Sequence, residues 1–181
     1  MEKLLDTGKV KAIGVSNFTV RHLEHLLPHV NVVPAVNQVE AHPYLTQPQL
    51  FRFCQDKGIL LQAYSPLGNN TTGEPRTVDD PLVQQIAQQL GMDAGVVLGS
   101  WGVQRGTVVL PKSVTPSRIA SNLLVKELPA AVFAQLNSLE RHKRFNFPAR
   151  WGVDIFDEVG EDRARQIAKE EALANKLKFT V

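Results

Sequence analysis

The sequence has a single cysteine, Cys54, and therefore no intramolecular disulfide bond. Cys54 follows Leu50, Phe51 and Phe53 in a segment with the pattern of an inward-facing helix surface, which predicts a buried and unreactive thiol. We find no early run ordered like a signal peptide, and no apolar run long enough to span a bilayer. These absences together favour a reducing cytoplasm as the location, with no membrane partner.

An excess of charge of either sign is also missing. The 20 lysines and arginines nearly balance the 18 aspartates and glutamates, which leaves a formal net charge of +2 at pH 7. This balance argues against nucleic acid or a membrane surface as the partner. Any phosphate-binding site must therefore depend on a few local cations. No residues have metal-ligand spacing and no nucleophile–base pair stands out, so we expect no metal site.

Apolar runs and amphipathic segments alternate along the chain. Extended apolar runs at 10–15, 32–40, 59–64 and 107–110 predict four strands, and Pro34 confines the pairing of the second to the residues beyond it. Spacing and capping residues predict helices at about 20–27, 48–57, 81–90, 94–105, 116–125 and 130–141, with Ser16 or Asn17 as the cap of the first. The third strand is almost entirely apolar, as expected for a strand covered on both faces. Strict alternation implies parallel strands that helical crossovers connect.

Two architectures fit this order, a doubly wound open sheet and part of an eight-stranded barrel. The Gly-x-Gly-x-x-Gly fingerprint of the open sheet follows none of the strands. A whole (β/α)8 barrel needs roughly 200 to 250 residues and eight strand–helix units, and this sequence offers four. We therefore predict an α/β half-barrel over residues 1–144, followed by a loop and a charged helix at 145–181. Residues 1–9 have the pattern of a helix already in progress, ended by Gly8.

The carboxyl ends of the four predicted strands carry distinctive residues. Their sequences are, in chain order, GVSNF at 14–18, NQVEAHPY at 37–44, AYSPLG at 63–68 and LPKSVTPSR at 110–118. In barrels of parallel strands, functional side chains gather at these ends. The amides and hydroxyls of the first two ends suit a carboxamide, and the aromatic ring of the third suits a flat heterocycle.

The fourth strand end has the composition of a phosphate site. Lys112 supplies a point charge and Arg118 a planar fork, beside a predicted helix start whose free N–H groups and dipole favour an anion. Taken together, the four ends describe a nicotinamide dinucleotide with an extra phosphate. Each group also has a simpler explanation: a helix cap for Ser16 and Asn17, core packing for Tyr64, and a solvated surface pair for the two cations. The order of all four along the chain favours the site.

The order and wording of these motifs resemble those of the fungal-type aldo-keto reductases, over nearly the whole chain. This resemblance implies a (β/α)8 barrel, of which the chain would hold strands five to eight, and NADP(H) bound in an extended form without a Rossmann domain. It implies cofactor roles for ten residues: Ser16, Asn17 and Gln38 at the nicotinamide carboxamide, Tyr64 on the nicotinamide ring, Ser65 and Leu67 along the pyrophosphate, Lys112, Ser113 and Arg118 at the 2′-phosphate, and Asn122 at the adenine.

The same resemblance implies the reaction, which is reduction of an aldehyde or ketone by NADPH or its reverse, on a small carbonyl or alcohol substrate. The family's catalytic aspartate, tyrosine, lysine and histidine belong to the first four strands, so we expect none of them in this chain. His42 is expected to be structural, and Trp151 and Phe156 to lie on a substrate-facing loop. A non-enzymatic NADP-binding or interaction module is the alternative. Open barrel edges would favour self-association.

Overall fold

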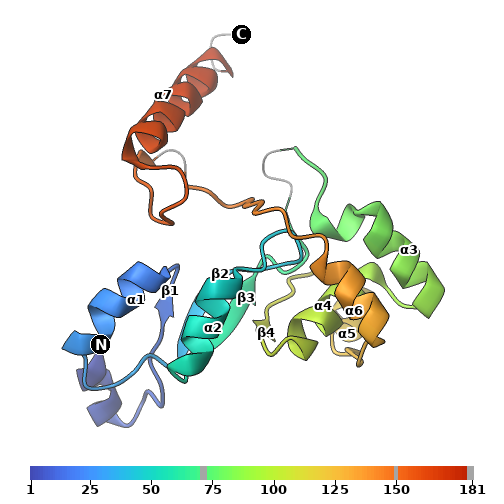
Figure 1. The fold of residues 1–181 in the computed structure, drawn as a ribbon, viewed down its shortest axis with the longest axis horizontal. Helices are drawn as coiled ribbons and strands as arrows, with labels where there is room; N and C mark the ends of the chain where they lie inside the picture. The colour runs from blue at the N-terminus through green and yellow to red at the C-terminus, as the bar shows by residue number, and fades with distance from the viewer. Residues whose placement is uncertain (70–72, 149–150, 179–181) are drawn as a thin grey trace. The chain divides into compact units, whose positions relative to one another are not determined.

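The computed structural model describes residues 1–69, 73–148 and 151–178. Its contacts divide the chain into two compact units, Met1–Phe145 and Asn146–Val181, and each is described by itself. The first unit contains the sheet and most of the helices (Figure 1). The functional division at residue 144 stays a prediction.

Four parallel strands form one sheet in the order β1-β2-β3-β4. They are β1 (Val15–Ser16), β2 (Val36–Glu40), β3 (Leu60–Tyr64) and β4 (Val108–Val109). The register pairs Ser16 with Gln38, Gln38 with Gln62, and Gln62 with Val108, so these four residues form one row across the sheet. This arrangement confirms the predicted α/β class and is that of a partial (β/α) barrel.

The strands are shorter than predicted, for two physical reasons. Pro34 lacks an N–H group, and pairing of β2 begins only beyond it, at Val36, as expected. The edge strands β1 and β4 each have a neighbour on one side only, and each keeps two paired residues. The predicted strand ranges 10–15 and 107–110 were therefore too long.

In the described part of the first unit, one α-helix follows each of β1 and β2, and two follow each of β3 and β4. They are α1 (Val20–Leu26), α2 (Pro48–Asp56), α3 (Pro81–Leu90), α4 (Ala94–Gln104), α5 (Pro116–Ser121) and α6 (Ala130–Asn137), with short 3-10 turns η1 (Glu2–Thr7), η2 (Leu27–His29) and η3 (Thr77–Asp79). Local chemistry sets many of their ends. Asp80 and Asp93 accept from backbone N–H groups at the starts of α3 and α4, and Gly91 ends α3 at φ 61°.

Three helix predictions were wrong at their boundaries. Thr19, not Ser16 or Asn17, caps α1, because its side chain accepts from the backbone of His22 while the His22 ring accepts from the backbone of Thr19. The helix α5 ends at Ser121 rather than 125, and α6 ends at Asn137 rather than 141.

Side chains on one face of the sheet pack against α1 and α2. The cluster joins Leu61, Ala63 and Val39 of the strands to Leu23 of α1 and Cys54 of α2. α2 runs alongside β2 and β3 in Figure 1. A second cluster joins α3, α4 and α6 around Trp101 of α4. These two clusters form the apolar core of the first unit.

The opposite face of β3 is not covered as predicted. Leu61 and Ala63 are each 2% exposed, whereas Leu60, which points to the other face, is 55% exposed. Successive side chains of a strand point to opposite faces. The apolar run at 59–64 therefore belongs to a strand that is buried on its helix side alone.

The second unit contains α7 (Glu161–Lys178), the predicted charged helix, and the turn before it. Burial of Asp154 disfavours its charged form, but backbone N–H groups, including those of Val159 and Gly160, hold the pKa of this carboxyl below its usual value. The rings of Phe147 and Phe156 lie 6.1 Å apart, centroid to centroid. Within the described ranges, no helix has both the length and the apolar character needed to cross a membrane.

Candidate cofactor site

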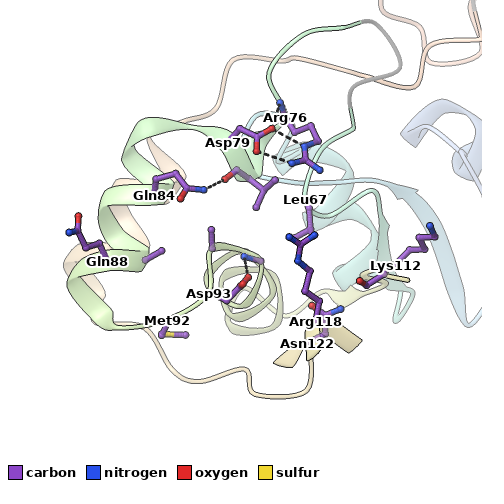
Figure 2. A pocket seen from close by; sticks show the side chains of 15 residues that line it. Leu67, Arg76, Asp79, Gln84, Gln88, Met92, Asp93, Lys112, Arg118 and Asn122 are labelled. Atoms are coloured by element: carbon purple, nitrogen blue, oxygen red, sulfur yellow. Dashed lines mark hydrogen bonds and ion pairs between the residues drawn. The ribbon is translucent and has the colours of Figure 1, made fainter. Parts of the chain in front are cut away.

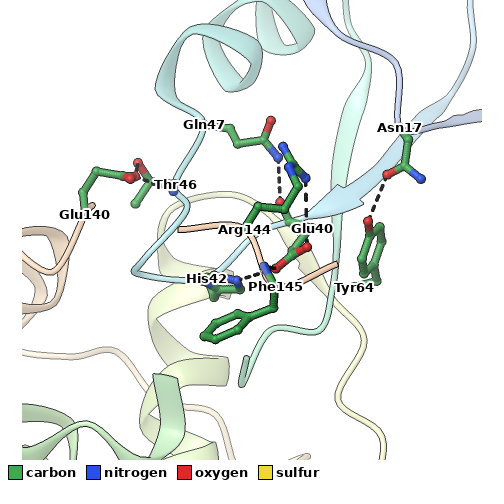
Figure 3. Close-up of polar contacts among 9 residues, drawn as sticks. All are labelled: Asn17, Glu40, His42, Thr46, Gln47, Tyr64, Glu140, Arg144 and Phe145. Atoms are coloured by element: carbon green, nitrogen blue, oxygen red, sulfur yellow. Dashed lines mark hydrogen bonds and ion pairs between the residues drawn. The ribbon is translucent and has the colours of Figure 1, made fainter. Parts of the chain in front are cut away.

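The residues predicted to bind the nicotinamide lie close together near the carboxyl ends of β1, β2 and β3. The backbone carbonyl of Gln38 accepts from the Asn17 N–H and from the Ser16 hydroxyl, each at 2.9 Å. The Tyr64 hydroxyl donates to Asn17 Oδ1 at 3.1 Å, as Figure 3 shows. The structure therefore brings these four predicted residues into one hydrogen-bonded group, which we call the strand-end group.

A buried amide that the sequence analysis missed fixes the loop at this group. Asn37 donates through Nδ2 to the Phe18 carbonyl at 2.8 Å and accepts from the Phe18 N–H at 3.4 Å. Asn17, the preceding residue, has φ 59°, a left-handed conformation that asparagine tolerates better than most residues. Asn37 alternates with the inward-facing Val39 along β2, and a polar residue at such a position is a signal of a buried hydrogen bond, although it does not identify the partner.

Five of the six residues predicted at the phosphates and the adenine line a pocket of about 510 Å³. Five of the ten predicted cofactor residues belong to it: Leu67, Lys112, Ser113, Arg118 and Asn122. Arg118 and Asn122 lie one helical turn apart, and the Asn122 N–H donates to the Arg118 carbonyl at 3.0 Å. In Figure 2 the Arg118 side chain extends toward Leu67, whereas the amino group of Lys112 points away from it. Ser65, which has φ 47°, lies two positions before Leu67 in the sequence but does not line the pocket.

The charges around the pocket divide into paired and unpaired sets. Arg76 donates to both carboxylate oxygens of Asp79 at 2.8 Å, and this contact lowers the pKa of Asp79 below its usual value. Asp93 accepts from the Gly95 N–H at 2.7 Å and caps α4. Among the described residues, neither Lys112 nor Arg118 has a carboxylate within ion-pair distance. The pocket therefore keeps an excess of positive charge, which favours an anion.

The helix at this site contributes less than the sequence suggested. α5 has six residues, Pro116–Ser121, and its cap residue Thr115 makes no side-chain capping bond. Ser113 Oγ accepts from the Thr115 N–H at 3.1 Å instead. Because a short helix has a small dipole, the anion would depend mainly on the Lys112 and Arg118 side chains.

His42 lies in a buried network rather than in a reactive position. Its Nε2 is 2.9 Å from Glu40 Oε1, and both side chains are fully buried. The Phe145 N–H donates to the same Glu40 oxygen at 2.8 Å, and Arg144 Nη1 is 4.0 Å from the other oxygen (Figure 3). His42 thus contacts the carboxylate that holds residues 144–145 against β2. Its structural role stays a prediction.

Tyr44 is the other tyrosine of the chain, and its hydroxyl is hydrogen-bonded to a carboxylate. The ring is 6% exposed, and its hydroxyl donates to Asp80 Oδ2 at 2.5 Å. The Arg141 guanidinium lies 3.7 Å from the ring centroid. Burial and the bond to Asp80 raise the pKa of Tyr44 to about 12. A buried phenol that holds its proton this tightly is a poor donor to a substrate at neutral pH.

The two predicted substrate-loop residues lie in the second unit. Trp151 is 57% exposed, whereas Phe156 is 8% exposed and faces Phe147. Their role beside a substrate stays a prediction. Among the described residues, no three His, Cys, Asp or Glu side chains lie close enough together to hold a metal ion.

Comparison with known proteins decides the family. The sequence model described as the Aldo/keto reductase family matches residues 1–141. The chain belongs to this family. It is 46% identical over 162 residues to a D-galacturonate reductase of Hypocrea jecorina, covering 86% of this chain and 51% of that protein. It is 44% identical over 165 residues to a glycerol 2-dehydrogenase (NADP(+)) of the same organism, covering 87% and 52%.

A third relative, a D/L-glyceraldehyde reductase of Hypocrea jecorina, is 41% identical over 175 residues, which cover 91% of this chain and 53% of the relative. The chain thus spans about half the length of the curated relatives it matches. The fungal-type resemblance expected from the strand-end motifs is confirmed at the level of the family.

The Tyr44–Asp80 bond predicts that the Tyr44 phenol loses its proton only at strongly alkaline pH. The folded state binds the phenolic proton more tightly than the unfolded state, so the contribution to stability is complete below pH 10 and is lost as the pH rises toward 12. Ultraviolet titration of Tyr64→Phe, in which Tyr44 is the remaining phenol, should show ionisation near pH 12. The same variant unfolded in urea should ionise near pH 10. A folded Tyr44 that ionises near pH 10 would contradict the assignment.

Proposed function

We propose that this chain provides the NADP(H)-binding part of an aldo-keto reductase. The enzyme would reduce an aldehyde or ketone with NADPH, or oxidise the corresponding alcohol. The observation that carries this proposal is the pocket of about 510 Å³, which follows the strand-end group in the same unit. Two of its cations, Lys112 and Arg118, have no carboxylate partner within the described part of the chain. That volume lies within the range of roughly 300 to 1,000 Å³ typical of small-molecule sites.

The donors available fit NADP(H) piece by piece. Lys112, Ser113 and Arg118 would hold the 2′-phosphate, the group that distinguishes NADP from NAD. Asn122, one turn beyond Arg118, would meet the adenine. Ser65 and Leu67 would line the pyrophosphate between these residues and the strand-end group.

The strand-end group would hold the nicotinamide. Ser16, Asn17 and Gln38 present hydroxyl and amide groups that match a carboxamide, and Tyr64 presents an aromatic face. The cofactor supplies the hydride, and the protein must orient it and provide a proton to the carbonyl oxygen. The name of one relative includes NADP(+), and the names of others specify reductases, which supports both the cofactor and a small carbonyl or alcohol substrate.

We also propose that the protein acts in a reducing cytoplasm. Cys54 is a free and buried thiol, and burial raises its pKa, opposed by a hydrogen bond with Asn37. A thiol with a raised pKa is a weak nucleophile at neutral pH. Cys54 is therefore suited to packing between β2 and α2 rather than to redox chemistry.

The phosphate assignment predicts a selective loss of NADPH binding. Replacing Lys112 and Arg118 with methionine should lower the affinity for NADPH by about ten- to hundredfold per residue, because charge-assisted hydrogen bonds contribute about 1.5 to 3 kcal/mol each. NADH, which lacks the 2′-phosphate, should change little. Arg52→Met is the control for the loss of a cation, because Arg52 is exposed on α2 outside this pocket, and it should leave both affinities unchanged. Equal losses for NADPH and NADH in calorimetric titrations would show that the assignment is wrong.

A second candidate function, an NADP-binding module without catalysis, is favoured by one observation. Both tyrosines of the chain are engaged in hydrogen bonds, Tyr44 with Asp80 and Tyr64 with Asn17. We propose that these 181 residues alone bind the cofactor and do not carry the family's proton donor.

This proposal predicts no turnover by the isolated chain. NADPH oxidation with a reactive aromatic aldehyde should not exceed a protein-free blank, because general acid catalysis typically contributes about 10²- to 10⁴-fold. The measurement is the loss of NADPH absorbance at high protein concentration. Turnover that Tyr44→Phe or His42→Ala abolishes would reveal a substitute acid in the buried network and reject the proposal.

We further propose that free copies of the chain pair through their sheet edges. β1 and β4 lie at the two edges and run parallel, so a two-fold axis along the strands would place β4 of one copy beside β1 of the other in the same direction. Pairing at both edges would arrange eight parallel strands around one axis. It would also cover Leu60, Val108 and Leu110, which are exposed on the face away from α1 and α2.

Self-association predicts a mass above that of the monomer at micromolar concentration in sedimentation experiments. Val108→Lys should shift the distribution toward monomer, because a charge on an exposed edge strand opposes pairing. Gln85→Lys, on the exposed surface of α3, is a control for added charge and should change nothing. A wild-type monomer with cooperative melting and no binding of a hydrophobic dye would contradict the proposal.

A further inference from the structure

A row of polar side chains crosses the open face of the sheet. Ser16, Gln38 and Gln62 occupy successive strands at one level of the register, and Val108 ends the row. The interiors of barrels with parallel strands are filled mostly by branched apolar side chains. Two adjacent glutamines on this face therefore call for a physical reason beyond packing.

The two glutamines are joined by a side-chain hydrogen bond. Gln38 Nε2 donates to Gln62 Oε1 at 2.7 Å, and both residues are partly buried. The backbone of Gln38 is also held, because its carbonyl accepts from Ser16 and Asn17. Gln38 is thus constrained at its main chain by β1 and at its amide by β3.

The bond with Gln62 decides which end of the Gln38 amide is available. An amide has a donor end and an acceptor end, and neighbouring hydrogen bonds select its orientation. Because Nε2 is directed to Gln62, Gln38 presents its Oε1 as an acceptor. A nicotinamide carboxamide carries an NH₂ donor that matches this oxygen.

We infer that Gln62 is a positioning residue, which orients the Gln38 amide so that Oε1 accepts from the nicotinamide carboxamide. This inference rests on the proposed NADP(H) site. Tyr64 lies two residues beyond Gln62, so both side chains are on the same face of β3. The Gln38–Gln62 amide pair and the Tyr64 ring are therefore neighbours on that face. Gln62 acts through Gln38 and is not assigned a contact with the reacting atoms.

The test compares two probes that differ in the nicotinamide. NADP⁺ contains it, and adenosine 2′,5′-bisphosphate keeps only the adenosine and phosphate parts. Gln62→Met, close in size but without the amide acceptor, should weaken NADP⁺ by about three- to tenfold in calorimetry, the effect of one neutral hydrogen bond. The bisphosphate affinity should not change, because Gln62 does not line the pocket at Lys112 and Arg118.

Gln62→Glu serves as the rescue variant. Its carboxylate still accepts from Gln38 Nε2, and its negative charge attracts the positively charged ring, so NADP⁺ affinity should equal or exceed that of the wild type. Melting of each variant is measured in parallel. If Gln62→Met does not fold, Gln62→Asn, whose side chain is too short to reach Gln38, makes the same comparison.

The possible failures are distinguishable. If the wild type binds neither probe, the proposed function itself is wrong, and this inference fails with it. If the wild type binds both probes and the variants weaken both equally, Gln62 has only a structural role. Unchanged NADP⁺ affinity in Gln62→Met and in Gln62→Asn would also overturn the inference.

Discussion

The pairing of β2 with β3 is the constraint on which both faces of the sheet depend. Five consecutive residue pairs join these strands, from Val36 with Leu60 to Glu40 with Tyr64. Because side chains alternate along a strand, a shift of one residue would exchange the two faces. The register that buries Val39 and Ala63 against the helices also places Gln38 beside Gln62. Core packing and the strand-end group are therefore consequences of the same alignment.

Electrostatic selectivity in this chain is local. The net charge is close to zero, and the cations that line the pocket of about 510 Å³ differ in their contacts. Arg76 is neutralised by Asp79, whereas Lys112 and Arg118 have no such partner among the described residues. Composition could exclude a basic binding face. It could not determine which individual cations remain unpaired, because that depends on contacts within the folded loops.

Local patterns in the sequence were sufficient for the order of the elements and many of their ends. The caps at Asp80 and Asp93 and the left-handed stop at Gly91 follow from chemistry within a few residues. The cap of α1 was assigned wrongly because three polar residues, Ser16, Asn17 and Thr19, precede that helix within five positions, and only the reciprocal bond with His22 selects Thr19. Strand lengths were overestimated because pairing depends on neighbours that the sequence does not specify.

The residues of the candidate site could likewise be predicted only in part. The motifs named the residues at the strand ends, and the structure brings four of them into hydrogen-bond contact. Asn37 and Gln62 were missed because a polar residue within a strand gives no indication of its partner. Likewise, the bond of Tyr44 to Asp80 joins residues 36 positions apart, beyond the reach of any local pattern.

The contacts of residues 140–145 with the segment after β2 have a consequence for the folding of the chain during synthesis. Glu40 is buried and accepts from the Phe145 N–H, 105 residues later, while Tyr44 accepts through its carbonyl from the N–H groups of Arg141 and Lys143. A ribosome adds these residues last within the first unit. Until they emerge, the Glu40 carboxylate lacks this donor, and its burial would be costly. The Glu40 carboxylate at the end of β2 therefore gains this donor only after every strand and helix of the first unit has been made.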